Sequence, residues 1–145
     1  MAYREKLAWL TLAVMLMTYS VYFLMVTLWI APAAPQGVAM LHMLVLFAGV
    51  TVVHAVLVAI GAALLAVRAR ADGEERADER DRAIARRGTH IAYYVLMTGM
   101  VLVGLVMPFG DARWKIVNAA LLALVLAEAT RHAVVVLSYK RGWHG

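Results

Sequence analysis

The chain has 145 residues, 64% of them hydrophobic, and its mean hydropathy of +0.78 is well above that of soluble domains. It contains no cysteine, which excludes disulfide frameworks, thiolate metal sites, iron–sulfur clusters and cysteine nucleophiles. The net charge of +5 comes from arginines beside apolar segments, where they meet lipid headgroups, so we expect a lipid bilayer around the protein and no nucleic acid bound to it.

Four apolar segments of the chain are long enough to cross a membrane. The first covers residues 7–30, and at about 1.5 Å per residue its 24 residues exceed a hydrocarbon core of about 30 Å. It resembles a signal peptide, but its apolar run is longer than the usual roughly 7 to 15 residues. We therefore expect an uncleaved anchor, which Pro32 and Pro35 bring to an end. The later predicted spans are residues 38–67, 91–107 and 114–139.

The connections between these spans predict how they pair. Seven residues separate the first span from the second, and a similarly short turn around Pro108 separates the third from the fourth. Connections of this length usually join antiparallel neighbours. We therefore predict an all-α integral membrane bundle, a single domain over residues 1–145 with four transmembrane helices in two antiparallel hairpins.

The segment between the second and third spans, residues 68–90, carries most of the charge. It holds thirteen of the 23 Asp, Glu, Lys and Arg residues. Together with the two ends of the chain it contributes eleven Lys and Arg to one side of the membrane, against Arg113 and Lys115 on the other. Because the more positive side faces the cytoplasm, we predict a multi-pass inner-membrane protein with both termini and this segment cytoplasmic.

Within this segment the pattern predicts a cytoplasmic helix over about residues 74–87 that ends at Gly88. Ile84 lies on a narrow apolar seam between an acidic and a basic flank. In a parallel pair of such helices, acidic and basic flanks would face each other, so we predict a homodimer or another assembly through this helix. The alternatives are a solvated connector and a divalent-cation site, which the neighbouring arginines oppose, so no metal is predicted. The acidic flank consists of Glu74, Asp78 and Asp81, and the basic flank of Arg76, Arg80 and Arg87.

Part of this segment resembles the signature of an uncharacterised family of small prokaryotic four-span inner-membrane proteins. The matching pattern, DERD…I…RG…AYY, comprises Asp78-Glu79-Arg80-Asp81, Ile84, Gly88 and Ala92-Tyr93. The resemblance covers this segment and the layout of the spans. It implies a four-span fold and an inner-membrane location, and it implies no particular activity.

Three ionisable residues lie inside the fourth predicted span, namely Glu128, Arg131 and His132. Their spacing of i, i+3 and i+4 projects them from one face of a helix. A lone charge near the middle of a bilayer costs about 2.5 to 3.5 kcal/mol on insertion scales, so we expect Glu128 and Arg131 to pair with each other or with another helix. A structural clasp and a functional site both remain open.

His54 is the second polar candidate, inside the second span. Two membrane histidines, His54 and His132, could ligate a haem from different helices. Counted from the cytoplasmic boundary, His54 lies roughly 9 Å or more deeper than His132, which argues against a shared haem. We therefore predict no cofactor, with haem as the alternative.

No serine–histidine–acid arrangement, glycine-rich phosphate loop or His-Glu-x-x-His motif is present, so we predict that the protein is not an enzyme. The favoured function is an accessory or regulatory membrane module that assembles with itself or with another membrane protein. One alternative is a small proton-coupled transporter that works as a dimer through Glu128 and His132. The other is a b-type haem-binding or quinone-binding membrane subunit.

Overall fold

Helices make up nearly all of the described chain. The computed structural model describes residues 3–33, 36–71 and 79–142, and these ranges contain no strand. Short π-helical and 3-10 turns follow the first and the third of four long α-helices. The α-helices are α1 (Tyr3–Met25), α2 (Val38–Ala71), α3 (Glu79–Val101) and α4 (Arg113–Lys140), and the turns are η1 (Val26–Ile30), η2 (Ala31–Ala33), η3 (Leu102–Val106) and η4 (Met107–Phe109).

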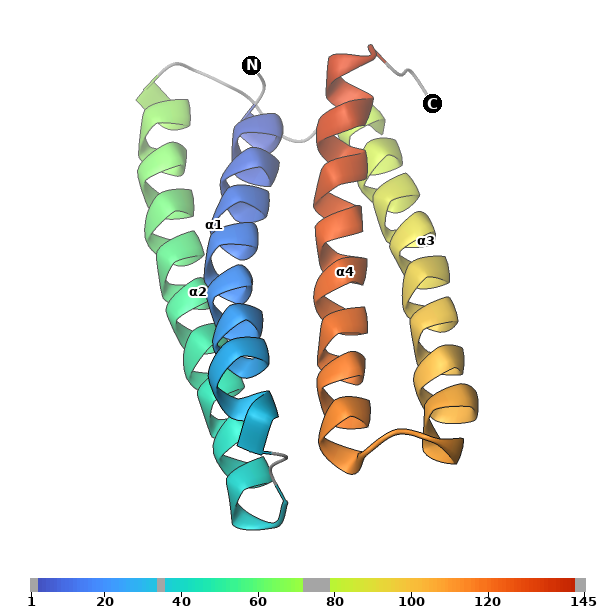
Figure 1. The fold of residues 1–145 in the computed structure, drawn as a ribbon. Helices are drawn as coiled ribbons and strands as arrows, with labels where there is room; N and C mark the ends of the chain where they lie inside the picture. The colour runs from blue at the N-terminus through green and yellow to red at the C-terminus, as the bar shows by residue number, and fades with distance from the viewer. Residues whose placement is uncertain (1–2, 34–35, 72–78, 143–145) are drawn as a thin grey trace.

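The helices form two antiparallel hairpins, α1 with α2 and α3 with α4 (Figure 1). α1 also packs along α4 and so joins the two hairpins. Both termini, the end of α2 and the start of α3 lie at one end of the bundle. Counted with the turns that follow them, the four helices are 28 to 34 residues long and apolar enough to cross a membrane. The predicted all-α four-helix fold is confirmed, and the chain is a multi-pass membrane protein.

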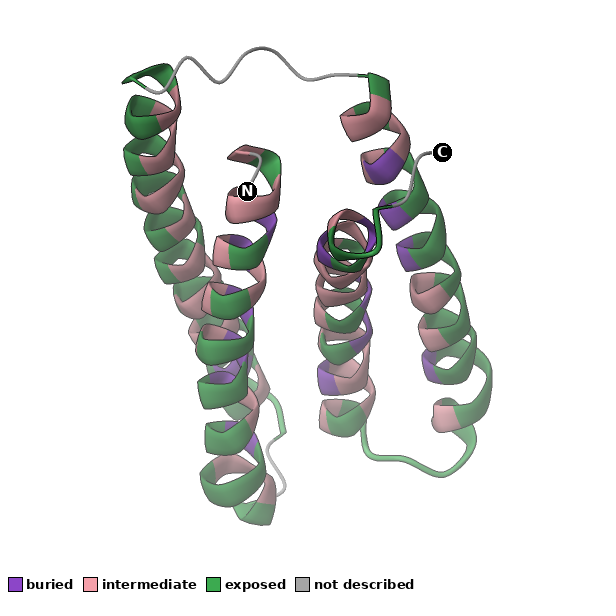
Figure 2. Cartoon of the chain, turned by 90° about the horizontal axis from the view of Figure 1, so that it is seen from above, coloured by how far each residue is buried: buried purple, intermediate pink, exposed green. Residues whose placement is uncertain are grey.

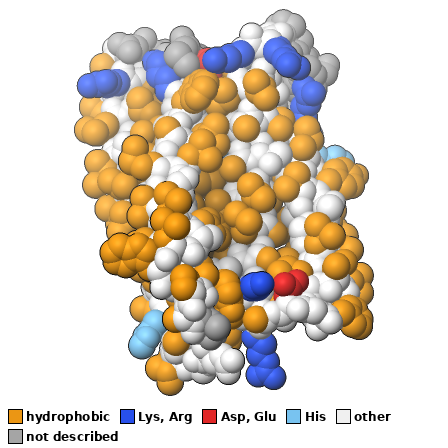
Figure 3. Space-filling model, viewed as in Figure 1, with side chains coloured by type: hydrophobic (Ala, Val, Ile, Leu, Met, Phe, Trp, Pro, Cys, Tyr) orange, Lys and Arg blue, Asp and Glu red, His pale blue; other side chains and the backbone are white. Residues whose placement is uncertain are grey.

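Apolar side chains cover the outside of this bundle. Figure 2 shows exposed residues along every helix, and α2 has only Met43 buried among its 34 residues. In Figure 3 hydrophobic side chains cover the long sides, whereas Lys and Arg gather mostly at the end that holds the termini. Soluble proteins rarely expose apolar patches of this size, but a bilayer covers them. The surface therefore agrees with the predicted membrane location.

The best-buried part of the interior joins three helices in the half of the bundle far from the termini. Tyr22, Val26 and Met43 form a buried cluster, against which Trp114 of α4 packs. The hydroxyl of Tyr22 donates a hydrogen bond of 2.8 Å to Oδ1 of Asn118. Nδ2 of Asn118 in turn donates to the carbonyl oxygen of Trp114 at 2.9 Å. A polar link inside the apolar cluster thus fixes α1 against α4.

α3 differs from the prediction that a separate cytoplasmic helix ends at Gly88. The chain stays helical from Glu79 to Val101, so the charged segment from Glu79 and the third span are one helix. Gly88 is buried, and a Cβ atom at this position would lie 2.9 Å from the carbonyl oxygen of Arg131. The missing side chain lets α3 approach the backbone of α4 closely, as small residues do between membrane helices. Gly88 is therefore a packing glycine and does not end a helix.

The apolar seam of α3 packs against α4, whereas the prediction has it face a second copy of the chain. Ile84 is fully buried, with 0% exposure, inside the single chain. Because Gly88, one turn later, packs on α4, this side of α3 is already occupied by its own hairpin partner. The prediction that Ile84 contacts a second copy is therefore wrong. Glu74 and Asp78 lie outside the described residues, as does the predicted start of the cytoplasmic helix.

Candidate functional site

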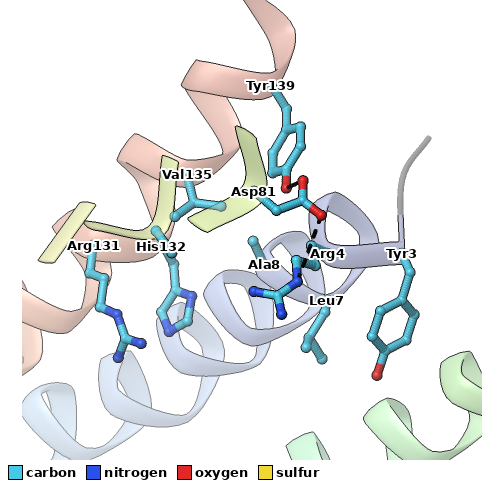
Figure 4. A pocket seen from close by; sticks show the side chains of 10 residues that line it. Tyr3, Arg4, Leu7, Ala8, Asp81, Arg131, His132, Val135 and Tyr139 are labelled. Atoms are coloured by element: carbon cyan, nitrogen blue, oxygen red, sulfur yellow. Dashed lines mark hydrogen bonds and ion pairs between the residues drawn. The ribbon is translucent and has the colours of Figure 1, made fainter. Parts of the chain in front are cut away.

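A crevice of about 260 Å³ opens between α1, α3 and α4 at the end of the bundle that holds the termini (Figure 4). Its apolar walls come from α1, with Leu7 and Ala8, and from Ala85 of α3 and Val135 of α4. Six polar or ionisable side chains line this small volume. They are Tyr3, Arg4, Asp81, Arg131, His132 and Tyr139.

Asp81 is the centre of the contacts at the mouth of the crevice. The hydroxyl of Tyr139 donates a hydrogen bond to its Oδ1, and Nε of Arg4 lies 3.8 Å from its Oδ2. Figure 4 shows both contacts, which tie the start of α3 to the end of α4 and to the start of α1. Nζ of Lys140 lies 4.9 Å from the ring centre of Trp9 and adds a cation–π link between α4 and α1. The mouth is therefore held by contacts from all three helices.

Glu128 contacts two of the side chains that line the crevice. Nη1 of Arg131 lies 3.3 Å from its Oε2, and Nε2 of His132 lies 3.8 Å from the same oxygen. The expected pairing of Glu128 with Arg131 is thus present, and it lies within α4 and not between helices. The carboxylate, the guanidinium and the imidazole thus form one connected group. Two of its members, Arg131 and His132, line the crevice.

The single chain does not enclose this ion pair. The side chains of Arg131 and Glu128 keep 44% and 47% of their surface exposed. Glu128 lies 15 residues after the start of α4 and 12 before its end, or about 22 and 18 Å along the helix axis. The pair is therefore a partly exposed ion pair near the middle of a span and not a buried clasp.

His54 lies on α2 and does not line the crevice. Its ring packs on that of Tyr19 with the centroids 5.5 Å apart, and the Tyr19 hydroxyl donates to Oγ1 of Thr51 at 3.3 Å. Nδ1 of His54 is buried and finds no hydrogen-bond partner within the described ranges. A haem held by two histidines needs both imidazoles on opposite faces of one flat cavity, and the crevice offers His132 alone, so it does not fit this cofactor.

The structure brings together part of the predicted site. Asp81, Arg131 and His132 line the crevice, and Glu128 forms an ion pair with Arg131. Arg80 is partly buried and lies near enough to Tyr139 to interact electrostatically, whereas Arg87 is exposed on α3. The intramembrane cluster and the cytoplasmic helix, which the sequence treats as two separate sites, therefore meet at one crevice.

The sequence does not single out Arg4 and Tyr139 as site residues. Arg4 enters only the charge count of its membrane side, and Tyr139 only marks the end of a predicted span. The bond between Tyr139 and Asp81 joins positions 58 residues apart, which no helical periodicity relates. The signal that could identify them is their place at the same end of the predicted spans, at the same predicted depth as Asp81.

No family model, no curated protein and no solved structure matches this chain. The resemblance to the four-span family through the DERD segment therefore stays a prediction. The functional argument rests on the fold and on the geometry of the crevice and of the Glu128–Arg131 pair.

Proposed function

We propose that this protein is a non-enzymatic accessory or regulatory module of the inner membrane that works as a homodimer with cytoplasmic termini. The Glu128–Arg131 pair supports this function most directly, because it lies near the middle of α4 with almost half of each side chain exposed. A second copy that covers this face would remove both charges from lipid. The eleven basic residues on the side of the termini support the orientation.

The depth of Glu128 and Arg131 makes their exposure unfavourable for a single chain. A charged residue at the centre of a membrane helix costs about 2.5 to 3.5 kcal/mol on insertion scales, and such residues normally face protein or a water-filled cavity. Their contact at 3.3 Å offsets part of this cost. In a single chain the remaining exposed surface of these two side chains would still contact the lipid around α4. A protein surface of complementary charge at this depth would therefore stabilise the fold.

A two-fold axis along the membrane normal supplies such a surface from a second copy. In an interface of this symmetry, residue i of one chain meets residue j of the other, and j meets i. Such an axis keeps each residue at its own depth, and Arg131 lies about 4.5 Å further along α4 than Glu128. The long Arg131 side chain can span this offset and reach the Glu128 carboxylate of the other copy, beside the point where the two helices meet. The same two residues supply both signs of charge, and the interface needs no second kind of protein.

Reversed charges test this dimer sharply. Glu128→Arg places two cations on the face, and Arg131→Glu places two anions there. Each variant expressed alone should be monomeric in mild detergent, because like charges would meet across the interface. The two variants expressed together should restore a dimer, and a tag on one of them should recover the untagged other.

Restored pairing cannot arise within one chain, because each variant places like charges beside each other on its own α4. The matched control reverses the exposed pair Asp111–Lys115, which lies at the opposite end of the bundle at 3.9 Å. Asp111→Lys and Lys115→Asp should each leave the dimer unchanged. A wild-type protein that is monomeric in lipid nanodiscs, or a mixture of the reversed variants that stays monomeric, contradicts the proposal.

Proton-coupled transport is the second candidate function. It is favoured by His132, which both lines the crevice and lies 3.8 Å from Glu128, so that a protonatable pair adjoins a cavity at the end with the termini. Vesicles that contain the protein should then take up protons faster than empty vesicles after a pH jump, and Glu128→Gln should abolish the difference. Equal proton uptake by protein-containing and empty vesicles excludes this candidate.

A further inference from the structure

We propose that the crevice between α1, α3 and α4 binds the headgroup of a zwitterionic phospholipid. The phosphate would contact the guanidinium group of Arg4, and the ammonium group would contact the carboxylate of Asp81. Residues from the start of α1 and the end of α4 line the crevice, and Lys and Arg gather at this end of the bundle (Figure 3). Basic side chains beside membrane spans lie at the depth of lipid headgroups. This binding does not depend on the proposed dimer.

The charges that line the crevice favour one kind of headgroup. Two guanidinium groups line it, and each has a carboxylate partner: Asp81 for Arg4 and Glu128 for Arg131. A headgroup with a net charge would leave one sign without compensation. A headgroup that carries a phosphate and an ammonium group, joined by a two-carbon linker, offers an opposite charge to the cations and to Asp81 alike.

Arg4 is placed so that it can bind a phosphate without leaving Asp81. Its contact with the carboxylate uses Nε, at 3.8 Å, and Figure 4 shows its two terminal nitrogens on the side away from Asp81. The Arg4 side chain is 44% exposed, so these nitrogens are accessible. Guanidinium groups bind phosphate oxygens through such paired donors with defined geometry. Arg131 lines the deeper side of the crevice and stays paired with Glu128.

Asp81 is oriented before any ligand arrives. The Tyr139 hydroxyl holds one of its oxygens, and only 17% of its side chain is exposed, on the crevice side. A carboxylate fixed in this way can accept from an ammonium group without first losing side-chain freedom, which favours binding. Tyr139 and Arg4 therefore act as positioning residues for Asp81 in addition to joining the helices.

The size of the crevice fits a headgroup and not a whole lipid. Its volume of about 260 Å³ is below the roughly 300 to 1,000 Å³ of pockets that enclose complete small-molecule ligands. Leu7, Ala8, Ala85 and Val135 provide apolar walls at the level where the glycerol backbone would lie. The acyl chains would then continue along the exposed apolar sides of the helices, in contact with the bilayer.

Competition between two lipids in native mass spectrometry tests the inference. The full chain in nonionic detergent is mixed with equal amounts of phosphatidylethanolamine and phosphatidylglycerol that carry identical acyl chains. The wild type should retain phosphatidylethanolamine in preference. Arg4→Gln should weaken its retention by at least about tenfold, the effect of losing one charge-assisted hydrogen bond. Asp81→Asn should shift the preference to phosphatidylglycerol, because the Arg4 guanidinium then lacks its carboxylate counter-charge.

Two further variants separate binding from folding and from charge in general. Ala85→Phe fills the crevice and leaves every charge in place, so it should abolish retention while the helical circular dichroism stays that of the wild type. Lys115→Gln removes a basic residue at the opposite end and should change nothing. Equal retention of both lipids by the wild type, or undiminished retention by Ala85→Phe, overturns the proposal. Displacement of the lipid by excess inorganic phosphate also overturns it, since the crevice would then bind the free ion.

Discussion

The hydroxyl of Tyr22 donates a hydrogen bond to Oδ1 of Asn118 at 2.8 Å and so joins α1 to α4 across 96 positions of the sequence. Tyr22 has no exposed surface and Asn118 is 8% exposed. The bond therefore lies in an apolar interior, where neither group has water as a substitute partner. It couples the first hairpin to the second in the half of the bundle opposite the crevice.

Tyr22→Phe should destabilise the protein by about 1 kcal/mol, because it removes the donor and leaves the Asn118 oxygen unpaired. Hydrogen bonds between membrane helices contribute about 0.6 kcal/mol on average and up to about 1.7 kcal/mol. Reversible unfolding in mixed micelles measures the loss. Thr27→Val is the matched control, since Oγ1 of Thr27 bonds only to carbonyl oxygens of its own helix. If Tyr22→Phe and Asn118→Ala have strictly additive effects, the two side chains are not coupled.

Gly88→Ala should destabilise the protein by about 1 kcal/mol or more, although alanine favours helices. The added Cβ atom would lie 2.9 Å from the carbonyl oxygen of Arg131, which cannot rotate away, so α3 must move off α4. Such overpacking costs about 1 to 3 kcal/mol, more than the gain in helix propensity of at most about 1 kcal/mol. Gly49→Ala is the control, because nothing lies within 4 Å of its new atom. Equal stability of the two variants in micelle unfolding would mean that α3 does not approach α4 at this glycine.

The sequence predicts the elements of this fold well because their signal is local. A bilayer demands long uninterrupted apolar helices, and the four spans, their turns and their antiparallel pairing follow from run lengths alone. The spacing of Glu128, Arg131 and His132 likewise predicts that they share one face of α4, and their contacts confirm it. These are properties of single helices, and single helices obey simple periodicities.

What the sequence does not predict is which helix each face meets. The seam that includes Ile84 suits a second copy as well as the neighbouring α4, and the pattern alone cannot distinguish the two. Gly88 is equally ambiguous, because a glycine after two arginines is typical of a helix end and also of close helix packing. The contact of Asp81 with Arg4 and Tyr139 depends on three helices at once, so no one segment carries a sign of it.

The orientation in the membrane can be measured with topology reporters. Fusions after Ala71 and after the last residue should report a cytoplasmic location, and an insertion at Gln36 should report the opposite side. The reason is the excess of eleven Lys and Arg over two on the side of the termini. Ala71 suits a fusion because it is the last residue of α2, whereas a fusion between Glu79 and Val101 would interrupt α3. An external signal after Ala71 would reverse the assignment of the crevice to the cytoplasmic side.

Single cysteines can locate the proposed dimer contact, because the chain has no cysteine of its own. Leu124→Cys should form a disulfide with its own copy in native membranes. Leu124 is 49% exposed and lies one turn before Glu128 on the same face of α4. A two-fold axis along the membrane normal brings identical positions at the centre of such an interface together.

Two other single-cysteine variants serve as controls for this crosslink. Leu122→Cys is similarly exposed, at 40%, but lies about 200° around the helix from Leu124, so it should stay reduced. Ile84→Cys should also stay reduced, because Ile84 is fully buried against its own chain. Equal crosslinking at Leu124 and Leu122 would indicate random encounters in the membrane. Crosslinking at Ile84 alone would place the contact on α3 and require that α3 separate from α4, which the packing of Gly88 on Arg131 opposes.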